Sequence, residues 1–125
     1  MFASTKAFSG FAVGDIAEAR EFYERTLGLS VSEENGLLTL HLAGDRDTLV
    51  YAKPDHVPAT YTILNFAVDD VERAVDDLTA RGVRFERYDG IDQDEKAISR
   101  DPQGPPIAWF TDPAGNILAV LEVPA

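Results

Sequence analysis

A near-duplication within the chain limits its fold more than any other feature. The segment 11–19, Phe-Ala-Val-Gly-Asp-Ile-Ala-Glu-Ala, recurs 55 residues later at 66–74 as Phe-Ala-Val-Asp-Asp-Val-Glu-Arg-Ala, so that Asp15 corresponds to Asp70. Repeats of this length indicate two similar supersecondary units, each too small to bury its apolar face alone. We therefore expect one α+β domain over residues 1–125, made of two modules (about 5–53 and 60–125) and a Pro-bearing linker at 53–59.

Each copy predicts a strand, a helix cap and an amphipathic helix. Asp15 or Asp70 precedes an apolar stripe at helical spacing, and the stripe ends at Gly28 or Gly82. Three short β-forming runs follow each helix, at 29–32, 37–42 and 48–52 in the first copy and at 83–88, 107–111 and 116–123 in the second. The order βαβββ, repeated, predicts a curved, cup-like mixed sheet with the helices on its outer face.

Composition narrows the class of function. The chain has no cysteine, which excludes disulfides, thiolate chemistry and cysteine-ligated zinc. Its formal net charge of −11 repels phosphate backbones and anionic membranes and attracts cationic small molecules, although solubility is the simpler interpretation. The first residues lack the basic and apolar regions of a signal peptide. We expect a cytoplasmic protein that binds neither nucleic acid nor membrane.

Several local motifs, taken with the double module, carry a resemblance to a known family. They are the capping Asp15, the pair Phe22-Tyr23, the run Leu27-Gly28-Leu29 and the turn Asp112-Pro113-x-Gly115-Asn116. With them the chain resembles the vicinal oxygen chelate superfamily, which includes glyoxalase I, extradiol dioxygenases, fosfomycin-resistance enzymes, methylmalonyl-CoA epimerase and bleomycin-resistance proteins. The resemblance covers nearly the whole chain. It implies the fold more strongly than any activity, because one scaffold hosts several chemistries.

The resemblance also implies a metal site, which this sequence does not match. Enzymes of the family hold a divalent metal with four His or Glu side chains, two from each module. The corresponding positions here are Phe8, Val50, Ile63 and Ala119. All four are hydrocarbon side chains, and a slip of one residue along any strand brings no His, Glu or Asp into place. We expect no metal at the usual site and no cofactor.

Alternation along the predicted strands indicates which side chains line the concave face. The expected ligand pocket is apolar with a few polar groups and comprises Phe8, Thr39, His41, Val50, Ile63, Asn65, Trp109 and Ala119. The same alternation places Leu49 and Tyr51 beneath the helices. Trp109 is interpreted either as packing or as a stacking platform, and His41 either as a hydrogen-bonded sheet residue or as a catalytic base. No serine or threonine lies in a known nucleophile motif.

An acidic loop at 88–96 is a further candidate element. Asp92, Asp94 and Glu95 would form a lid that selects a cationic ligand, or they belong to an ordinary solvated loop. The spacing of a calcium-binding loop is not present. Together with His41 these carboxylates also provide the residues for a relocated metal site.

Three functions remain open at this point. The first is a metal-free protein that binds a small apolar, aromatic or cationic compound, as in the bleomycin-resistance branch. The second is an enzyme of the lyase, isomerase or dioxygenase type with a relocated or non-standard metal site. The third is a structural module whose cavity is filled by its own side chains. The resemblance further implies a homodimer, because many relatives pair modules between chains.

Overall fold

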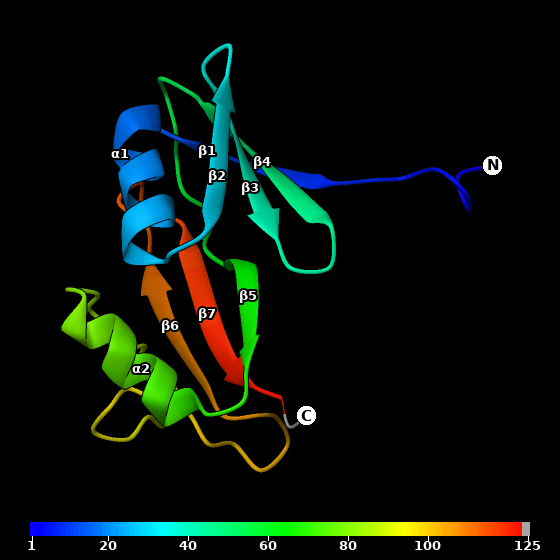
Figure 1. The fold of residues 1–125 in the computed structure, drawn as a ribbon. Helices are drawn as coiled ribbons and strands as arrows, with labels where there is room; N and C mark the ends of the chain where they lie inside the picture. Colours follow the sequence, from blue (N-terminus) through cyan, green and yellow to red (C-terminus); the bar gives the residue numbers. More distant parts are fainter. Residues whose placement is uncertain (124–125) are drawn as a thin grey trace. The chain divides into compact units, whose positions relative to one another are not determined.

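The computed structural model describes residues 1–123 and confirms an α+β protein of two tandem modules (Figure 1). Contacts divide the chain into two compact units, Met1–Val57 and Pro58 onward. The boundary between them falls inside the predicted linker 53–59. Each unit contains its own mixed sheet and its own helical segment, and neither sheet is closed into a barrel.

The first unit has four strands and one helical segment. Its elements are β1 Ser9–Val13, α1 Ile16–Glu21, the π-helical turn η1 Phe22–Thr26, β2 Ser30–Glu34, β3 Leu37–Leu42 and β4 Arg46–Ala52. The sheet order is β1-β4-β3-β2, with β1 parallel to β4 and the other pairs antiparallel. The predicted order βαβββ is therefore present in this module.

The first helix begins where the capping pattern predicts. Asp15 is extended and its Oδ1 accepts a hydrogen bond of 3.0 Å from the Glu18 amide, which satisfies one of the free donors of the first turn. The helix then widens into a π-helical turn, in which the Leu27 amide donates to the Phe22 carbonyl at 3.0 Å. Tyr23, in this turn, is fully buried, with its ring centroid 5.8 Å from that of Phe11 on β1.

The core of the first unit lies between this helix and one face of the sheet. Register pairs Val50 with both Phe11 and Leu38, so the three side chains share a face. Val50 and Leu38 are both fully buried. Because Phe11 contacts Tyr23, this is the face that the helix covers.

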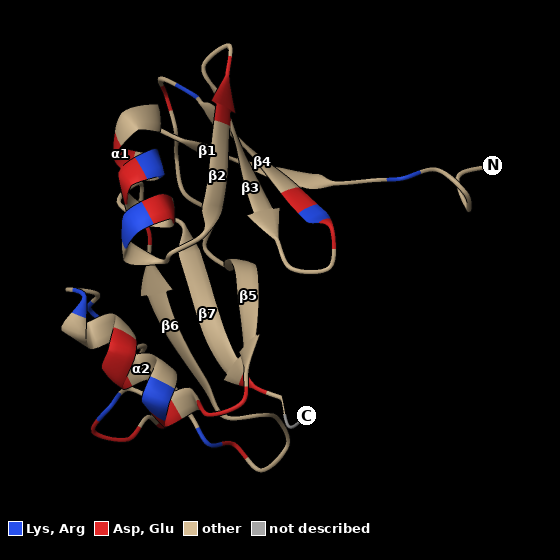
Figure 2. Cartoon of the chain, in the orientation of Figure 1, with Lys and Arg blue, Asp and Glu red and all other residues tan. Residues whose placement is uncertain are grey.

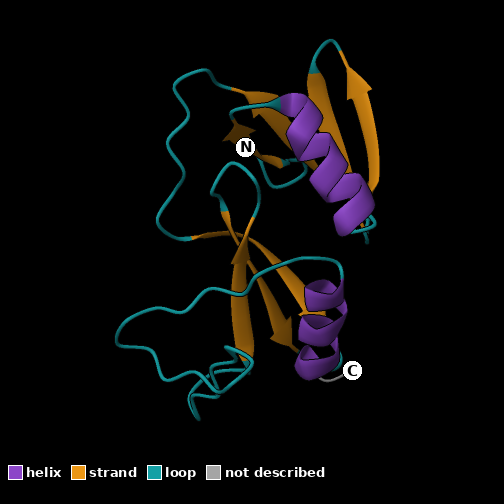
Figure 3. Ribbon diagram, turned by 90° about the vertical axis from the view of Figure 1, so that its left-hand side faces the viewer, coloured by secondary structure: helices purple, strands orange, loops and turns teal. Residues whose placement is uncertain are grey.

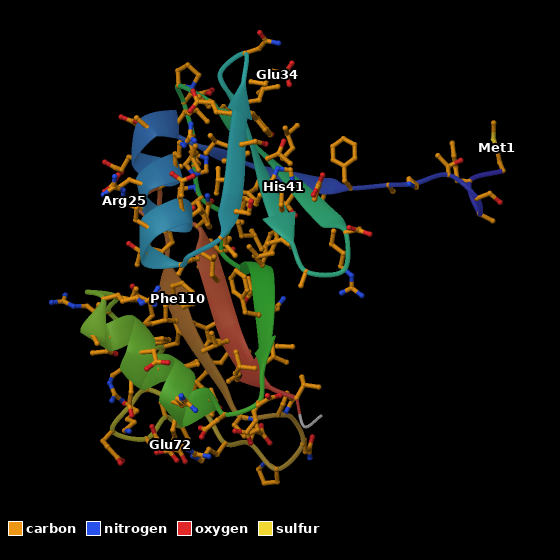
Figure 4. The ribbon with its side chains drawn as sticks, viewed as in Figure 1. Met1, Arg25, Glu34, His41, Glu72 and Phe110 are labelled. Carbon is orange, nitrogen blue, oxygen red and sulfur yellow. The ribbon has the colours of Figure 1, made fainter. Side chains whose placement is uncertain are left out.

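The second unit has three strands and one helix. Its elements are β5 Thr62–Val68, α2 Val71–Ala80, β6 Ile107–Thr111 and β7 Ile117–Glu122. The sheet order is β5-β7-β6, with β5 parallel to β7 and β6 antiparallel to it. Phe110 and Leu118 are register partners and fully buried in the core of this unit; Phe110 is labelled in Figure 4.

The prediction of a regular strand at 83–88 is wrong. A long loop joins α2 to β6 (Figure 3), and within 83–88 only Phe85 forms an isolated bridge, to Phe110. The Glu86 amide donates to the Trp109 carbonyl at 2.8 Å, so the segment does run along β6. The Gln93 side chain then occupies the neighbouring backbone groups: its Oε1 accepts from the Tyr88 amide and its Nε2 donates to the Glu86 carbonyl, both at 2.9 Å. The Gln93 side chain therefore satisfies two backbone groups of 83–88 that would otherwise bond to a neighbouring strand.

Charged residues are distributed unevenly over these elements. Figure 2 shows that acidic and basic residues lie along α1 and α2 and in several turns, whereas β5 and β6 carry none and β7 carries only Glu122, at its end. Glu122 is itself engaged, since its Oε1 accepts a hydrogen bond of 3.1 Å from the Val71 amide at the start of α2. Within residues 1–123, none of the helices is both long and apolar enough to cross a membrane.

The N-terminal cap of α2 allows a test of whether Asp70 has the same capping role as its counterpart in the first repeat. The Asp70 side chain accepts a 3.1 Å hydrogen bond from the Arg73 amide, as its counterpart Asp15 does from Glu18. Asp70→Ala is expected to lower the free energy of unfolding by about 1 kcal/mol, measured by urea denaturation. The adjacent Asp69→Ala serves as control, because Asp69 precedes the cap and is exposed. Equal destabilisation by the two changes would contradict the capping role of Asp70.

Candidate functional site

Three of the expected pocket residues lie in one row across the second sheet. Register aligns Asn65 on β5 with Ala119 on β7, and Ala119 with Trp109 on β6. They point to the face opposite the one that holds Phe110 and Leu118. Asn65 is exposed, Trp109 is partly exposed and Ala119 is fully buried. The row therefore has an amide at one end, an indole at the other and a methyl group between them.

Tyr88 extends the aromatic end of this row. Its ring meets the Trp109 ring edge-to-face with centroids 5.6 Å apart, although Tyr88 belongs to the loop before β6. Partial burial, aided by the Glu86 carboxylate, raises the pKa of the Tyr88 phenol. The Trp109 indole nitrogen makes no hydrogen bond within residues 1–123, which leaves its N–H available to another molecule.

Ile63 does not share the regular geometry of this row. The pairing of β5 with β7 shifts between Thr62 and Leu64, so that Thr62 pairs with Ile117 and Leu64 with Leu118. The irregularity interrupts the alternation two residues before Asn65. Register therefore does not assign Ile63 to the face of Asn65.

On the first sheet, the face opposite the helix carries the expected residues Thr39 and His41. Register pairs Thr39 with Ser32 on β2 and His41 with Asp47 on β4. His41, labelled in Figure 4, makes two side-chain hydrogen bonds. Its Nδ1 lies 3.0 Å from Asp47 Oδ1, and its Nε2 lies 2.8 Å from Ser32 Oγ. His41 is therefore the centre of a chain of three polar side chains on an exposed face.

The assignment of the faces of β4 requires a correction. Val50, expected in the pocket, is fully buried on the helix-covered face, and Leu49 and Tyr51, expected beneath the helix, have the opposite orientation. Tyr51 is 40% exposed. Because apolar residues occupy both faces at 49–51, alternation alone could not identify the inner face; the pairing of Val50 with Phe11 does. Phe8 lies just before β1 and is 72% exposed.

The side chains at the positions implied by the family do not fit a divalent metal. Phe8, Ile63 and Ala119 are hydrocarbons, and correcting the face of β4 replaces Val50 with Leu49 or Tyr51, neither of which is a His, Glu or Asp. Across the part of the chain that the structure describes, no group of three or more His, Cys, Asp or Glu residues is arranged to hold an ion. These side chains therefore offer a divalent metal no suitable ligands at the positions that the family uses.

The acidic loop is folded around Asp94. Its carboxylate accepts hydrogen bonds from the amides of Lys96 (2.9 Å) and Ile98 (3.0 Å), and Arg100 Nε lies 3.3 Å from its Oδ2. Partial burial acts to raise the pKa of Asp94, but the two amides and the Arg100 guanidinium outweigh it and hold the pKa below the usual value. Asp92 and Glu95, the other two expected lid residues, are exposed.

Ion pairs connect this loop to α2. Lys96 Nζ lies 3.0 Å from Asp76, and Arg100 lies 3.1 Å from Glu72, which is labelled in Figure 4. Residues of the loop and of the segment that follows it, within 90–102, enclose a groove of about 580 Å³. The groove is lined by Ile91 and Ile98 together with charged side chains, among them Asp92, Asp101 and Arg100. The loop is thus anchored at Asp94 and combines apolar and charged groups at the groove.

Sequence reasoning missed two residues that organise these sites. Gln93 binds three backbone groups, the third being the Ala97 carbonyl at 2.8 Å, yet a glutamine in a polar loop has no distinctive pattern. Ser32 binds His41 diagonally across two strands. The only signal for that contact was that the predicted β-forming runs 29–32 and 37–42 follow one another closely, which does not specify a register.

The chain matches one family model over nearly its whole length. Residues 7–120 match the Glyoxalase/Bleomycin resistance protein/Dioxygenase superfamily. The chain belongs to this superfamily. A comparison with curated proteins gives no match.

Solved structures with the superfamily fold include proteins of different activities. A superfamily member from Sphaerobacter thermophilus is 24% identical with a TM-score of 0.71, covering 94% of this chain and 98% of its own. A lactoylglutathione lyase from Agrobacterium tumefaciens is 20% identical with a TM-score of 0.68, covering 94% and 93%. An antibiotic binding protein from Streptomyces is 21% identical with a TM-score of 0.66, covering 98% of each chain. These similarities establish the fold but leave the activity of this member undetermined.

The hydrogen bonds of Asp94 predict a pH-dependent contribution to stability. A carboxylate with a lowered pKa in the folded state stabilises the fold fully above its unfolded pKa of about 3.9 and loses that contribution as pH falls through the folded value. Asp94→Asn should therefore lower the Tm at pH 7, and the difference from the unmodified chain should shrink in acid. Thermal unfolding across pH measures this. The exposed Asp92→Asn is the control, and a difference for Asp94→Asn that stays constant down to pH 2 would contradict the assignment.

The role of Gln93 can be tested separately. Gln93→Leu removes the partners of the Tyr88 amide and of the Glu86 and Ala97 carbonyls. It should lower the free energy of unfolding by about 1–3 kcal/mol, measured by urea denaturation, because part-buried backbone groups lose their hydrogen bonds. Gln103→Leu, at an exposed position, should change it little. Equal effects of the two substitutions would show that Gln93 does not anchor the loop.

Proposed function

We propose that this superfamily member is a metal-free small-molecule binding protein of the glyoxalase/bleomycin-resistance type. The observation that carries the proposal is the row of Asn65, Ala119 and Trp109, with Tyr88 beside it. Aromatic faces bind planar apolar compounds, and the Asn65 amide and the Trp109 N–H supply directional polar contacts. The function is to sequester a drug or metabolite that carries an aromatic group.

Charge supports a cationic character for this ligand. The net charge of −11 raises the local concentration of small cations around the chain. At the groove of the acidic loop, Ile91 provides apolar contact, since the Ile98 side chain is buried. The lining carboxylates (Asp92, Asp94 and Asp101) outnumber the one lining cation, Arg100. An aromatic compound with a basic amine would satisfy both features.

A second candidate is an enzyme of the superfamily with a non-standard site. Its support is that a lactoylglutathione lyase shares the fold and that His41, a residue able to act as a base, has both ring nitrogens hydrogen bonded. Binding without turnover ranks first, because the side chains at the usual metal positions have no donor groups that suit a divalent metal.

The chain offers a direct probe of ligand binding because Trp109 is its only tryptophan. A panel of aromatic amines, antibiotics and aromatic metabolites is expected to contain compounds that quench Trp109 fluorescence and raise the Tm. For a compound found in this way, Trp109→Ala should weaken binding about tenfold in calorimetry. Phe2→Ala, which removes an aromatic ring that is 74% exposed, should leave the affinity unchanged.

Two results would contradict the binding function. One is an affinity that is the same in the Trp109→Ala protein as in the unmodified chain. The other is a stoichiometric divalent metal in protein purified without chelators, which would favour the enzyme.

We further propose a homodimer in the cytoplasm. Pairing of modules between chains is a property of many relatives, and the absence of cysteine suits a reducing compartment. Sedimentation of the purified chain tests the dimer.

A further inference from the structure

Ser32, His41 and Asp47 form a connected chain of hydrogen bonds on the first sheet, on the face opposite the helix. Asp47 Oδ1 lies 3.0 Å from His41 Nδ1, and Ser32 Oγ lies 2.8 Å from His41 Nε2. Both distances fall in the range of about 2.6–3.2 Å expected between a nucleophile, its base and the group that orients the base. The three residues come from three adjacent strands, β2, β3 and β4, so regular backbone holds each of them.

The chemistry of the three groups determines which atom donates and which accepts in each of these hydrogen bonds. The Asp47 carboxylate can only accept a hydrogen bond, so it selects the His41 tautomer that carries hydrogen on Nδ1. In neutral imidazole Nε2 is then an acceptor, and the Ser32 hydroxyl donates to it. This is the polarity of a Ser-His-Asp triad, which is recognised by geometry and roles and not by the order of residues in a sequence.

We propose that Ser32 is a nucleophile activated by His41 and positioned through Asp47, and that it accepts acyl groups from activated esters. Ser32 Oγ bonds to the carbonyl carbon while its proton passes to His41 Nε2. The bond to the leaving oxygen then breaks, and that oxygen takes the proton from His41. Water hydrolyses the acyl-serine by the same route and restores the hydroxyl. No oxidant or reductant takes part.

Exposure limits the class of substrate. All three residues are exposed, with 41% of the His41 side chain and 55% of the Asp47 side chain open to solvent. Water would therefore solvate the developing oxyanion, a weaker stabilisation than that of buried, preorganised donors. The site suits esters with good leaving groups, such as aryl esters, and not amides.

Ser30 provides a matched control on the same face. Register makes Ser30 the direct cross-strand partner of His41, yet within the described residues the hydroxyl bonded to His41 Nε2 is that of Ser32. The two serines therefore share strand, face and exposure, and they differ in contact with the base.

The absence of cysteine from the chain makes a thiol test specific. Ser32→Cys and Ser30→Cys each introduce a single thiol, and their rates with a disulfide reagent at neutral pH are compared. A thiol beside His41 has a lowered pKa, so Ser32→Cys should react at least about tenfold faster than Ser30→Cys. Adding Asp47→Asn to Ser32→Cys should reduce that advantage, because the orientation of the imidazole is lost. Equal rates for the two single variants would overturn the proposal.

The acyl-transfer step is tested on the unmodified chain with p-nitrophenyl acetate. One acetyl group should appear on Ser32 by peptide mass mapping, together with a matching burst of p-nitrophenolate. Ser32→Ala should abolish both and His41→Gln should slow the burst about a hundredfold, whereas Ser30→Ala should leave the burst unchanged. Acetylation confined to lysines, or a burst that survives in Ser32→Ala, would overturn the assignment. Because the test uses no ligand of Trp109, its result is independent of the proposed binding function.

Discussion

The parallel pairing of the first and last strands within each module is the constraint on which both sheets depend. In the first unit β1 aligns with β4, and in the second β5 aligns with β7. These pairs join segments far apart in the chain, so their register determines which side chains meet on each face. It places Val50 beneath the first helix, and it places Asn65 and Ala119 in one row on the second sheet. The candidate sites follow from that alignment.

Local sequence signals predicted the helix starts and strand bounds that depend on residues close together in the sequence. Asp15 and Asp70 each accept a hydrogen bond from an amide three residues later, as the repeat implied, and β3 and β6 have the predicted bounds. The strand expected at 83–88 is absent from the described structure. Gln93 bonds the Glu86 carbonyl and the Tyr88 amide, and Ser99 takes both backbone groups of Ile107 on β6. Hydrogen bonds made within the loop therefore overrode a local β preference.

The candidate sites likewise combine features that local sequence predicts with features that depend on how the strands pair. On the second sheet, register places Asn65 and Trp109 on one face, and the bulky apolar Phe110 and Leu118 mark the other face as the inner one. On β4 the apolar run 49–51 fits either orientation, so only pairing with β1 resolves it. The contact of Ser32 with His41 depends on a diagonal between two strands, which sequence spacing does not encode.

The Gln93 side chain also changes how the second sheet meets its surroundings. An edge strand normally presents a row of free amides and carbonyls to which another protein molecule can add a strand. Beside β6, the Trp109 carbonyl accepts a hydrogen bond from the Glu86 amide. The Glu86 carbonyl and the Tyr88 amide are in turn bonded to the Gln93 side chain. An incoming strand would have to displace a folded loop before it could pair there. This loop thus protects one border of the sheet against fibril-like aggregation, without adding a charge or a proline to β6 itself.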